Sequence, residues 1–418
     1  MRSRLASKSC EVDQRWGRLV VVGGGCAGLT LAKTLIEQGV VHANRPLRII
    51  EPRDTYRRDR TWCFWHDKPS QDKEARIDAC ADLDAVTQHA WDRWSLTAGG
   101  RRVEVDSDEL EYRMVPSDAF YDSAIAAIDT CPHAELVLGT RVTDIEDKGE
   151  SVRVSTEHQT GGRDTFDASV VFDSRLNAAM FDPAKQGQTG VTLWQQFVGV
   201  EVEFDRPLGD AGMATLMDFD AAQSTLAGLP AAGFCYVLPT SPTSALIEAT
   251  VFAADCLPAN VIEQLLAEQL REFSKGRGMV REQYREQGTL PMSTVALDTA
   301  PSPRVRRIGL AGGFAKPSTG YAFAATQRFC DDLANQMRRG VEAPAVPIRS
   351  WRTTFLDRVF LCRLNRVLRR DPSVIGPLFV RMFAGTNASA MVRFLSDTGS
   401  VLDDLRVIAS MPKLPFML

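Results

Sequence analysis

A glycine-rich turn between a short apolar run and a helical segment constrains this chain most. The segment RLVVVGGGCAGLTLAKTLIEQG places Gly23, Gly25 and Gly28 in G-x-G-x-x-G spacing, directly after the apolar run 19–22. The first glycine of such a motif makes the tight turn, the second lets the backbone approach a pyrophosphate, and the third lets helix and strand pack closely. The free N–H groups of the following helix attract phosphates. The segment therefore predicts a parallel α/β sheet with a dinucleotide site at its edge.

An acidic residue follows at the expected distance. The segment PLRIIEPRD reads as a second strand that ends at Glu51. An acid at this position can hydrogen-bond the ribose hydroxyls of an adenosine. Strand, turn, helix, strand and acid together favour a dinucleotide site over an accidental glycine turn. They do not distinguish FAD from NAD.

A second glycine-rich stretch lies almost 300 residues later, in VRRIGLAGGFAKPSTGYAFAATQRFCDDLANQM. It again reads as strand, turn and helix, and it resembles the late motif of FAD-dependent hydroxylase-like flavoproteins. In that motif the turn and the helix meet the phosphates and the ring of the flavin. The resemblance implies cofactor contacts at Gly312, Gly313, Ala315 and Gly320, although many relatives carry an aspartate where this chain has Gly313.

A third element lies in ASVVFDSR, where Asp173 and Arg175 resemble the middle D-x-R element of the same flavoproteins. The resemblance implies that Asp173 contacts the cofactor. The alternative is that Asp173 only caps the end of a strand.

Between these pieces the pattern is mostly that of β-strands, including a hairpin around Gly99 and Gly100. A β-rich insert between FAD-binding pieces usually covers the reactive face of the flavin. We therefore expect an α/β fold in which a Rossmann-type FAD-binding domain carries a β-rich substrate domain and a C-terminal helical segment. The expected ranges are 17–64, 106–178 and 288–345 for the FAD-binding domain, 65–105 and 179–287 for the substrate-binding domain, and 346–418 for the helical segment.

Composition narrows the function. The chain has 418 residues and a net charge of -4, which argues against a general nucleic-acid binder. Its nine cysteines are scattered without a CxxC pair, as is typical of a reducing cytosol. No histidine pair has HExxH spacing, so we expect no metal site. No stretch approaches the roughly 20 apolar residues that span a bilayer.

The C-terminal part contains a basic amphipathic segment, WRTTFLDRVFLCRLNRVLRR. It carries six arginines against one acid, Asp357, and its apolar residues have helical spacing. Such a helix can lie on an anionic membrane surface. It can equally pack on the protein with a solvated arginine face. Both interpretations remain open from the sequence.

With these pieces in place, the sequence resembles bacterial lycopene beta-cyclases, which are FAD-dependent carotenoid cyclases. The likeness covers nearly the whole chain. Beyond the first glycine motif, it is carried by the segments TWCFW, FVGVEVE, MDF, VLPTSPTSALIEATVF, EQGTLPMS, PSTGYAF and LNRVL. The run 236–252 and EQGTLP are far more specific than a glycine motif alone.

The resemblance implies an isomerase of the intramolecular lyase type in carotenoid biosynthesis. Such an enzyme cyclises the linear ends of lycopene, or a related linear carotenoid, to beta-ionone rings, giving gamma- and then beta-carotene without net redox change. The resemblance also implies that FAD is active in its reduced form and that NADPH or NADH serves only as reductant. It places the protein in the bacterial cytoplasm, peripherally associated with the inner face of the membrane.

Cyclisation of this kind needs an acid, and the resemblance implies two carboxylates. Glu201 in FVGVE and Glu248 in ALIEAT match family glutamates, and Ala249 stands where relatives carry a second acid. An apolar setting would keep such a carboxyl protonated. Each glutamate could instead be an ordinary strand residue. Glu203 and Asp218 are weaker candidates.

The chemistry also needs dry, π-rich walls, because aromatic faces stabilise cations. Trp62 and Trp65 crowd into TWCFW, and we expect them to line an apolar tunnel together with Tyr321. The alternative for the two tryptophans is a plain place in the core.

Two other functions share the cofactor fold. An FAD-dependent monooxygenase of an apolar isoprenoid substrate would consume oxygen and NAD(P)H with each product. A non-catalytic flavoprotein would only bind carotenoid or membrane, and the glutamates set in specific motifs argue against it.

Overall fold

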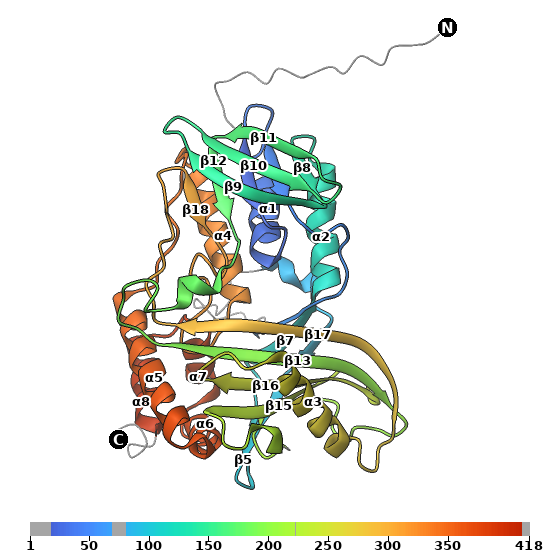
Figure 1. Cartoon of the computed structure of the whole chain (residues 1–418). Coiled ribbons are helices and arrows are strands. Elements are labelled where there is room, and N and C mark those ends of the chain that lie inside the picture. The colour runs from blue at the N-terminus through green and yellow to red at the C-terminus, as the bar shows by residue number, and fades with distance from the viewer. Residues whose placement is uncertain (1–17, 69–80, 222, 412–418) are drawn as a thin grey trace.

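The computed structural model of the chain describes residues 18–68, 81–221 and 223–411. Parts of the predicted domain ranges, at residues 17, 69–80 and 412–418, therefore lie outside the described residues. Figure 1 shows a unit built on a parallel sheet above a second unit built on a long antiparallel sheet, with a group of helices beside the second unit.

The first unit contains a five-stranded parallel sheet in the order β18-β12-β1-β2-β8. Its strands are β1 (Leu19–Val22), β2 (Leu47–Ile50), β8 (Ala134–Val137), β12 (Val170–Asp173) and β18 (Val305–Arg307). All four residues of β1 are buried, as expected for a parallel strand that is covered on both faces. The apolar run after Arg18 therefore forms the centre of this sheet.

Helices cover one face of the parallel sheet and a small sheet covers the other. The helices are α1 (Cys26–Glu37), α2 (Ser117–Thr130) and α4 (Phe323–Arg338). The small antiparallel sheet consists of β9 (Thr140–Asp147), β10 (Val152–His158) and β11 (Arg163–Ala168). Its inner valines Val142, Val152 and Val154 pack against Val20 and Val22 of β1.

The second unit is a seven-stranded, mostly antiparallel sheet in the order β17-β13-β16-β15-β14-β5-β6. Its strands are β5 (Arg93–Ala98), β6 (Arg101–Asp106), β13 (Thr192–Phe204), β14 (Met213–Asp218), β15 (Ala231–Pro239), β16 (Ser244–Ala253) and β17 (Met279–Ser293). The helix α3 (Ala259–Phe273) covers one face. The other face is turned toward the first unit and the C-terminal helices.

Strand alternation decides which residues of this sheet reach each face. On β16, Ile247, Ala249 and Val251 pack beneath α3, whereas Leu246 and Glu248 face the other side. Strands β13 and β15 alternate in the same way. Glu248 thus projects from a mostly apolar strand toward the first unit.

A three-stranded sheet joins the two units. It consists of β3 (Thr61–Asp67), β4 (His89–Trp91) and β7 (Leu110–Pro116), and β7 pairs with both of the other strands. Short 3-10 helices are η1 (Ala81–Val86), η2 (Ala178–Phe181), η3 (Ser224–Leu226) and η4 (Pro372–Val374).

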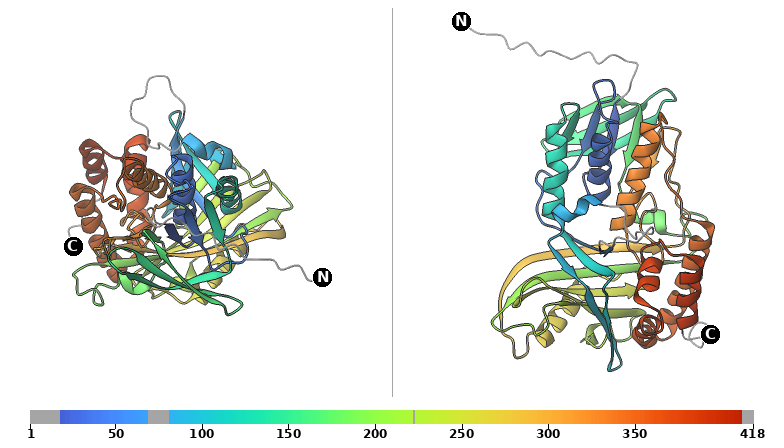
Figure 2. Two further views of the ribbon diagram at one scale, coloured as in Figure 1. Left: turned by 90° about the horizontal axis from the view of Figure 1, so that it is seen from above. Right: turned by 180° about the vertical axis from the view of Figure 1, so that it is seen from behind.

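The described part of the chain ends in four helices that pack beside the large sheet, as both views of Figure 2 show in red. They are α5 (Trp351–Arg370), α6 (Ile375–Ala384), α7 (Ala388–Leu395) and α8 (Val401–Ser410). The side of α5 that carries Phe360, Leu361 and Leu364 is buried, whereas Trp351 and Phe355 are exposed. The predicted amphipathic segment is therefore one helix that packs on the protein and still presents apolar side chains outward.

The expected fold class is confirmed, including the β-rich unit and the helical C-terminal segment. The hairpin at Gly99 and Gly100 also forms, with φ angles of 60° and 71° that suit glycine. Two strands continue through expected domain boundaries: β17 runs past residue 288, and β3 runs past residue 64. β17 pairs with β13 along its whole length, so residues 288–293 belong to the large sheet, and β3 pairs with β7 along its whole length in the joining sheet.

Candidate functional site

A cavity of about 690 Å³ lies where the two units and the C-terminal helices meet. Each part supplies a section of wall. Examples are Gly25, Glu51 and Gly309 from the first unit, Gln195, Glu248 and Phe252 from the large sheet, and Phe360, Phe379 and Phe394 from the helices. The cavity thus extends from the glycine turn to an apolar region beneath the C-terminal helices.

The first glycine turn has the geometry that its sequence predicts. Gly23 has a φ of 93°, and a Cβ atom on Gly28 would lie 1.9 Å from the Gly23 carbonyl oxygen. These two glycines therefore shape the turn and its packing against the helix. Gly25 lines the cavity, and a Cβ atom there would meet no atom within 4 Å. The open space at Gly25 is where a phosphate group could approach the backbone at the N-terminus of α1.

Glu51 lies beside this turn at the end of β2. Its carboxylate accepts hydrogen bonds from the backbone N–H of Gly24 at 2.5 Å and from the Nε of Arg53 at 2.8 Å. Arg53 and the hydroxyl of Tyr56 in turn donate to the Gly24 carbonyl oxygen, each at 2.9 Å. Glu51 also lines the cavity. It therefore holds the turn in place at the edge of the cavity.

Asp173 does not line the cavity. Its carboxylate is held by Arg175, which donates through Nε and Nη2 at 2.9 Å each. The neighbouring Ser174 lines the cavity instead and donates to the Val22 carbonyl oxygen at 2.7 Å. The D-x-R element thus supports the end of β12, and Ser174 is its cavity residue.

The late glycine stretch divides into two parts. Gly309, with a φ of 64°, and Gly320, with a φ of 74°, both line the cavity. Gly312, Gly313 and Ala315 do not. A Cβ atom on Gly312 would lie 2.4 Å from the Arg307 carbonyl oxygen, so this glycine is required for the turn itself.

Gly313 is tied to the C-terminal segment. It has a φ of 75°, and its carbonyl oxygen accepts a hydrogen bond from Arg349, which also donates to the Phe314 carbonyl oxygen. Gly313 is therefore a turn residue, and its backbone contacts the segment before α5.

The two tryptophans of TWCFW lie differently. Trp62 lines the cavity and stacks on Phe323, with ring centroids 5.4 Å apart. Trp65 is buried behind the wall, 4.7 Å from the ring of Tyr112 and 5.2 Å from that of Tyr321. Tyr112 and Tyr321 themselves line the cavity, so Trp65 supports the wall without forming it. Trp62 and Trp65 are three positions apart, so their side chains project from opposite faces of β3. The strand also runs away from the cavity between these two residues.

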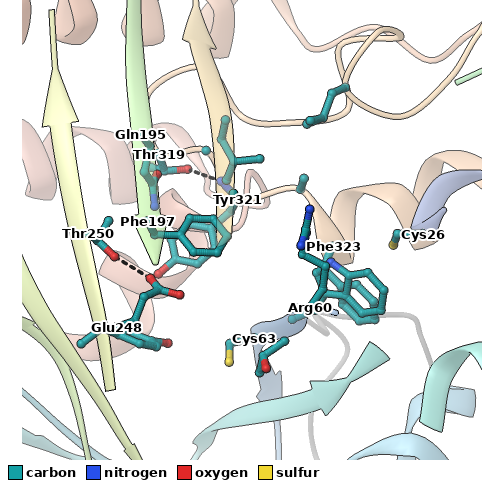
Figure 3. Close-up of a pocket in the computed structure, with 18 of the residues that line it drawn as sticks. Cys26, Arg60, Cys63, Gln195, Phe197, Glu248, Thr250, Thr319, Tyr321 and Phe323 are labelled. Atoms are coloured by element: carbon teal, nitrogen blue, oxygen red, sulfur yellow. Dashed lines mark hydrogen bonds between the residues drawn. The ribbon is translucent and has the colours of Figure 1, made fainter. Parts of the chain in front are cut away.

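Glu248 is a buried carboxyl group on the cavity side of β16. Figure 3 shows its side chain and that of Phe197 projecting from the large sheet into the same space. The hydroxyl of Thr250 donates to Glu248 at 2.5 Å. Burial, together with the nearby Glu286, raises the pKa of Glu248 far above the usual value for a glutamate. The group can therefore hold a proton at neutral pH.

Glu286 of β17 is a second buried carboxyl in the cavity wall. It accepts a hydrogen bond from the hydroxyl of Tyr284 at 2.7 Å, and burial raises its pKa as well. Glu286 was not among the predicted site residues, although it lies in EQGTLP, a segment that carries the family resemblance. The segment EQGTLP was therefore the sequence signal from which Glu286 could have been predicted.

Glu201 does not lie at the cavity. Its carboxylate pairs with Arg58 at 2.9 Å and accepts a hydrogen bond from Thr240 at 2.9 Å. It shares a face of β13 with Gly199, and its cross-strand neighbour Leu246 lines the cavity, but Glu201 itself does not. The expectation that Glu201 and Glu248 flank one tunnel is therefore not met by the geometry.

The weaker candidates are also outside the cavity wall. Glu203 pairs with Arg281 at 3.4 Å near the surface, and Asp218 lies at the end of β14. The side chain of Ala249 is buried beneath α3. An acid at position 249 would therefore point away from the cavity, so the alanine removes no group from it.

Membrane-spanning helices and metal clusters are both absent from the described part of the chain. Within residues 18–68, 81–221 and 223–411, no helix has the length and apolarity needed to cross a membrane. Over the same ranges, no group of three or more His, Cys, Asp or Glu residues is placed to hold a metal ion. The seven described cysteines are all free.

Similar solved structures share the fold over nearly the whole chain. A geranylgeranyl bacteriochlorophyll reductase-like protein from Thermoplasma acidophilum matches with a TM-score of 0.63 and 14% identity, covering 96% of this chain and 98% of the other. The p-nitrophenol 4-monooxygenase of Pseudomonas putida matches with a TM-score of 0.57 and 15% identity, covering 96% and 98%. A flavoprotein/dehydrogenase from Cytophaga hutchinsonii matches with a TM-score of 0.55 and 16% identity, covering 94% and 98%. At these identities the likeness establishes a flavoprotein-type fold.

Sequence similarity is more specific. A lycopene beta-cyclase from Paracoccus sp. (strain N81106 / MBIC 01143) is 31% identical over 239 residues, which is 53% of this chain and 57% of that relative. The match thus spans little more than half of the relative's length. The sequence model of the family described as "Lycopene cyclase protein" matches residues 18–418. Because that match includes the glycine turns, the large sheet with Glu248 and the C-terminal helices, the chain belongs to the lycopene cyclase protein family.

Proposed function

We propose that this protein is a lycopene beta-cyclase, which converts the linear ends of lycopene or a related carotenoid to beta-ionone rings. The observation that carries the proposal is Glu248, a carboxyl kept protonated by burial in an aromatic-walled cavity that reaches the glycine turn. The Paracoccus relative supports the choice of substrate. One cyclised end gives gamma-carotene, and two give beta-carotene.

The residues around the glycine turns fit an FAD. Gly25, Glu51, Gly309 and Gly320 all line the cavity, and a side chain at Gly25 would project into its open space. These residues would hold the pyrophosphate, the ribose and the flavin. When bound in its reduced form, the flavin would supply an electron-rich ring, and NADPH or NADH would serve to reduce it.

The carboxyl of Glu248 would start the reaction by protonating the end-group double bond, which leaves a tertiary cation. The neighbouring alkene then attacks this cation and closes the ring, and loss of a proton forms the ring double bond. Aromatic faces such as those of Trp62, Phe197 and Tyr321 can stabilise a desolvated cation by roughly 0.5–2 kcal/mol each. Apolar walls also exclude water, which would otherwise capture the cation as an alcohol.

The outer face of the C-terminal helices supports a peripheral membrane position. On α5, Trp351 is 82% exposed and Phe355 is 58% exposed, and on α8 Leu402 is 64% exposed. Arg352 of α5 pairs with Asp404 of α8, so these exposed side chains lie on adjacent helices. Such an apolar surface could rest in the interface of an anionic membrane, where lycopene itself is dissolved.

Exposed arginines border this surface. Arg358, Arg366, Arg369 and Arg370 are exposed along α5, at the turns that follow Trp351 and Phe355. Each basic residue near an anionic surface contributes about 1 kcal/mol to membrane binding. We infer that the apolar side chains and the arginines act together at the inner face of the bacterial membrane.

The proposed function is tested by incubating the purified protein with lycopene in anionic liposomes, with FAD reduced by dithionite and oxygen excluded. We expect cyclic carotenoids by chromatography, with no oxygen and no stoichiometric NAD(P)H consumed. A product that requires oxygen and uses NAD(P)H one-for-one would identify a monooxygenase of an isoprenoid instead.

A further inference from the structure

Gly199 of β13 separates two buried glutamates. It is paired with Glu248 of β16 on one side and with Glu286 of β17 on the other. The three residues therefore form one row across the sheet, and all three point to the same face. That face is the cavity wall, which both glutamates line.

The side chains of the two glutamates lean over this glycine. A Cβ atom on Gly199 would lie 3.3 Å from the Cγ of Glu286 and 3.4 Å from the Cβ and Cγ of Glu248. A residue larger than glycine at position 199 would therefore contact the side chains of both glutamates at once. The glycine in FVGVE is thus what allows two acidic side chains to occupy adjacent space in an apolar wall.

We propose that Glu248 and Glu286, brought together over Gly199, act as one acid–base pair that shares a single proton during cyclisation. The inference rests on the proposed function and adds a second proton-transferring residue to it. Two buried carboxyl groups in one site do not both ionise readily, because each negative charge disfavours the other. One group therefore holds the proton while the other is a carboxylate.

The surroundings decide which group is which. Glu286 accepts the hydrogen bond from Tyr284 and lies near the cations Arg58 and Arg60, all of which favour its charged form. Glu248 accepts its hydrogen bond from the uncharged hydroxyl of Thr250. The structure thus assigns the acid to Glu248 and the base to Glu286.

Other titratable groups face the pair from each surrounding element. Arg58 and Arg60 precede β3, Cys63 lies on β3, Tyr236 on β15, Tyr284 on β17, and Tyr321 before α4. Burial raises the pKa of Cys63, Tyr236 and Tyr321, so these groups stay neutral over the range in which the two carboxyls titrate. They supply polar atoms without adding charge.

The reaction balances within the pair. The Glu248 O–H bond breaks, its electrons stay on the carboxylate oxygen, and the π electrons of the end-group alkene form the new C–H bond. The second alkene supplies the electrons of the ring C–C bond. Glu286 then takes a proton from the carbon beside the new cation, and the electrons of that C–H bond become the ring double bond. The proton has moved from one carboxyl to the other, so its return across the pair restores the starting state without oxidant or reductant.

Infrared spectroscopy over a pH titration tests the pair without any substrate. We expect a protonated-carboxyl band at neutral pH that disappears in Glu248→Gln. In Glu286→Gln the same band should be lost at a lower pH than in the wild type, because the neighbouring charge is gone. Glu203→Gln, which changes a glutamate outside the cavity, should leave the titration unchanged. An unchanged Glu248 titration in Glu286→Gln would overturn the pair.

Kinetics under reducing, oxygen-free conditions then test its role. Glu286→Gln should lower kcat about 100- to 10,000-fold with normal flavin content and little change in KM, as expected for loss of a general base. Glu286→Ala should recover part of the rate with added formate, a small carboxylate. Gly199→Ala, which keeps both carboxyls but separates their stems, should lower kcat and shift the titration of Glu248.

The outcomes separate this inference from the proposed function. A wild type that cyclises lycopene while Glu286→Gln retains its full rate overturns the pair and leaves the cyclase. If the two carboxyls of the wild-type protein titrate as a coupled pair but the protein forms no ring, the proposed cyclase function is overturned. The role of the pair in proton transfer is then overturned as well.

Discussion

The ammonium group of Lys316 donates to the carboxylate of Asp357 over 2.7 Å, and both side chains are almost completely buried. Lys316 belongs to the late glycine stretch beside the cavity, and Asp357 belongs to α5. The Nζ of Lys316 also lies 5.1 Å from the centre of the Phe394 ring of α7. This ion pair therefore connects the turn expected to meet the flavin with the C-terminal helices.

Replacing Lys316 by methionine should destabilise the protein by about 3–5 kcal/mol, because Asp357 would keep a buried charge without a partner. Urea unfolding measures this loss. The double variant Lys316→Met/Asp357→Leu removes both charges and should recover most of it. A single variant as stable as the wild type would show that Asp357 finds another partner.

Replacing Gly25 by leucine should abolish the flavin absorbance of the purified protein. The added side chain would fill the open space beside the turn without disturbing the fold, since no atom lies within 4 Å of its Cβ position. Gly162→Ala, at an exposed glycine of the small antiparallel sheet's hairpin with equally open surroundings, is the matched control. Normal flavin content in Gly25→Leu would contradict the assignment of this turn.

Glu248→Gln and Glu201→Gln should fail in different ways. The amide at position 248 keeps the size of the side chain but removes the transferable proton, so activity should fall about 100- to 10,000-fold in a folded protein. The amide at position 201 weakens the pair with Arg58, so stability should fall while activity per folded molecule remains. Circular dichroism and turnover, measured side by side, distinguish the two. If Glu201→Gln is fully stable but loses turnover, Glu201 takes part in catalysis and this prediction is wrong.

Stability should decline as the pH rises into the neutral range. The pKa values of Glu248 and Glu286 are raised in the folded protein, so the folded state keeps protons that the unfolded chain loses above about pH 4.3. The free energy of unfolding therefore falls with pH until the folded-state groups have ionised. Glu248→Gln/Glu286→Gln should flatten this decline between about pH 5 and pH 8. If the urea midpoints of the double variant and the wild type change with pH in parallel, this prediction is wrong.

Trp351→Ser/Phe355→Ser should reduce flotation with anionic liposomes, because it removes exposed apolar area from α5. Neutralising Arg358, Arg363, Arg366 and Arg370 should weaken flotation further, and more strongly at low salt, where charges are less screened. Replacing exposed Arg163 of β11, far along the chain from α5, serves as the control. Equal flotation of all variants would remove the C-terminal helices from membrane binding.

Local patterns predicted much of the fold. The run 19–51 predicted strand, turn, helix, strand and acid because each step depends on neighbours in the sequence, and the amphipathic segment forms α5 over the same residues. The positions of Gly312 and Gly313 were less predictable. A glycine tolerated for its φ angle and a glycine beside a ligand look alike in sequence, and only the turn's packing against Arg307 separates them.

The carboxylates show why a site is harder to predict than a strand. Glu201 and Glu248 both lie in segments that carry the resemblance, yet Glu201 pairs with Arg58 and does not line the cavity, which no local pattern records. Glu286 reaches the site because β17 pairs with β13 in a register that places it opposite Gly199. That register pairs residues 87 positions apart in the chain, Gly199 and Glu286, which neither periodicity nor motif spacing reveals.

On α5, consecutive residues face different surroundings: Phe360 lines the cavity, and Val359 is 42% exposed on the outside. An α-helix with its side chains is about 10–12 Å across. At this point, α5 alone therefore separates the cavity from the outside of the protein. If the outer side of α5 rests in lipid, a polyene that passes from the bilayer to the cavity has only the width of this helix to cross. One end of the polyene can then stay in the bilayer while the other end is bound in the cavity.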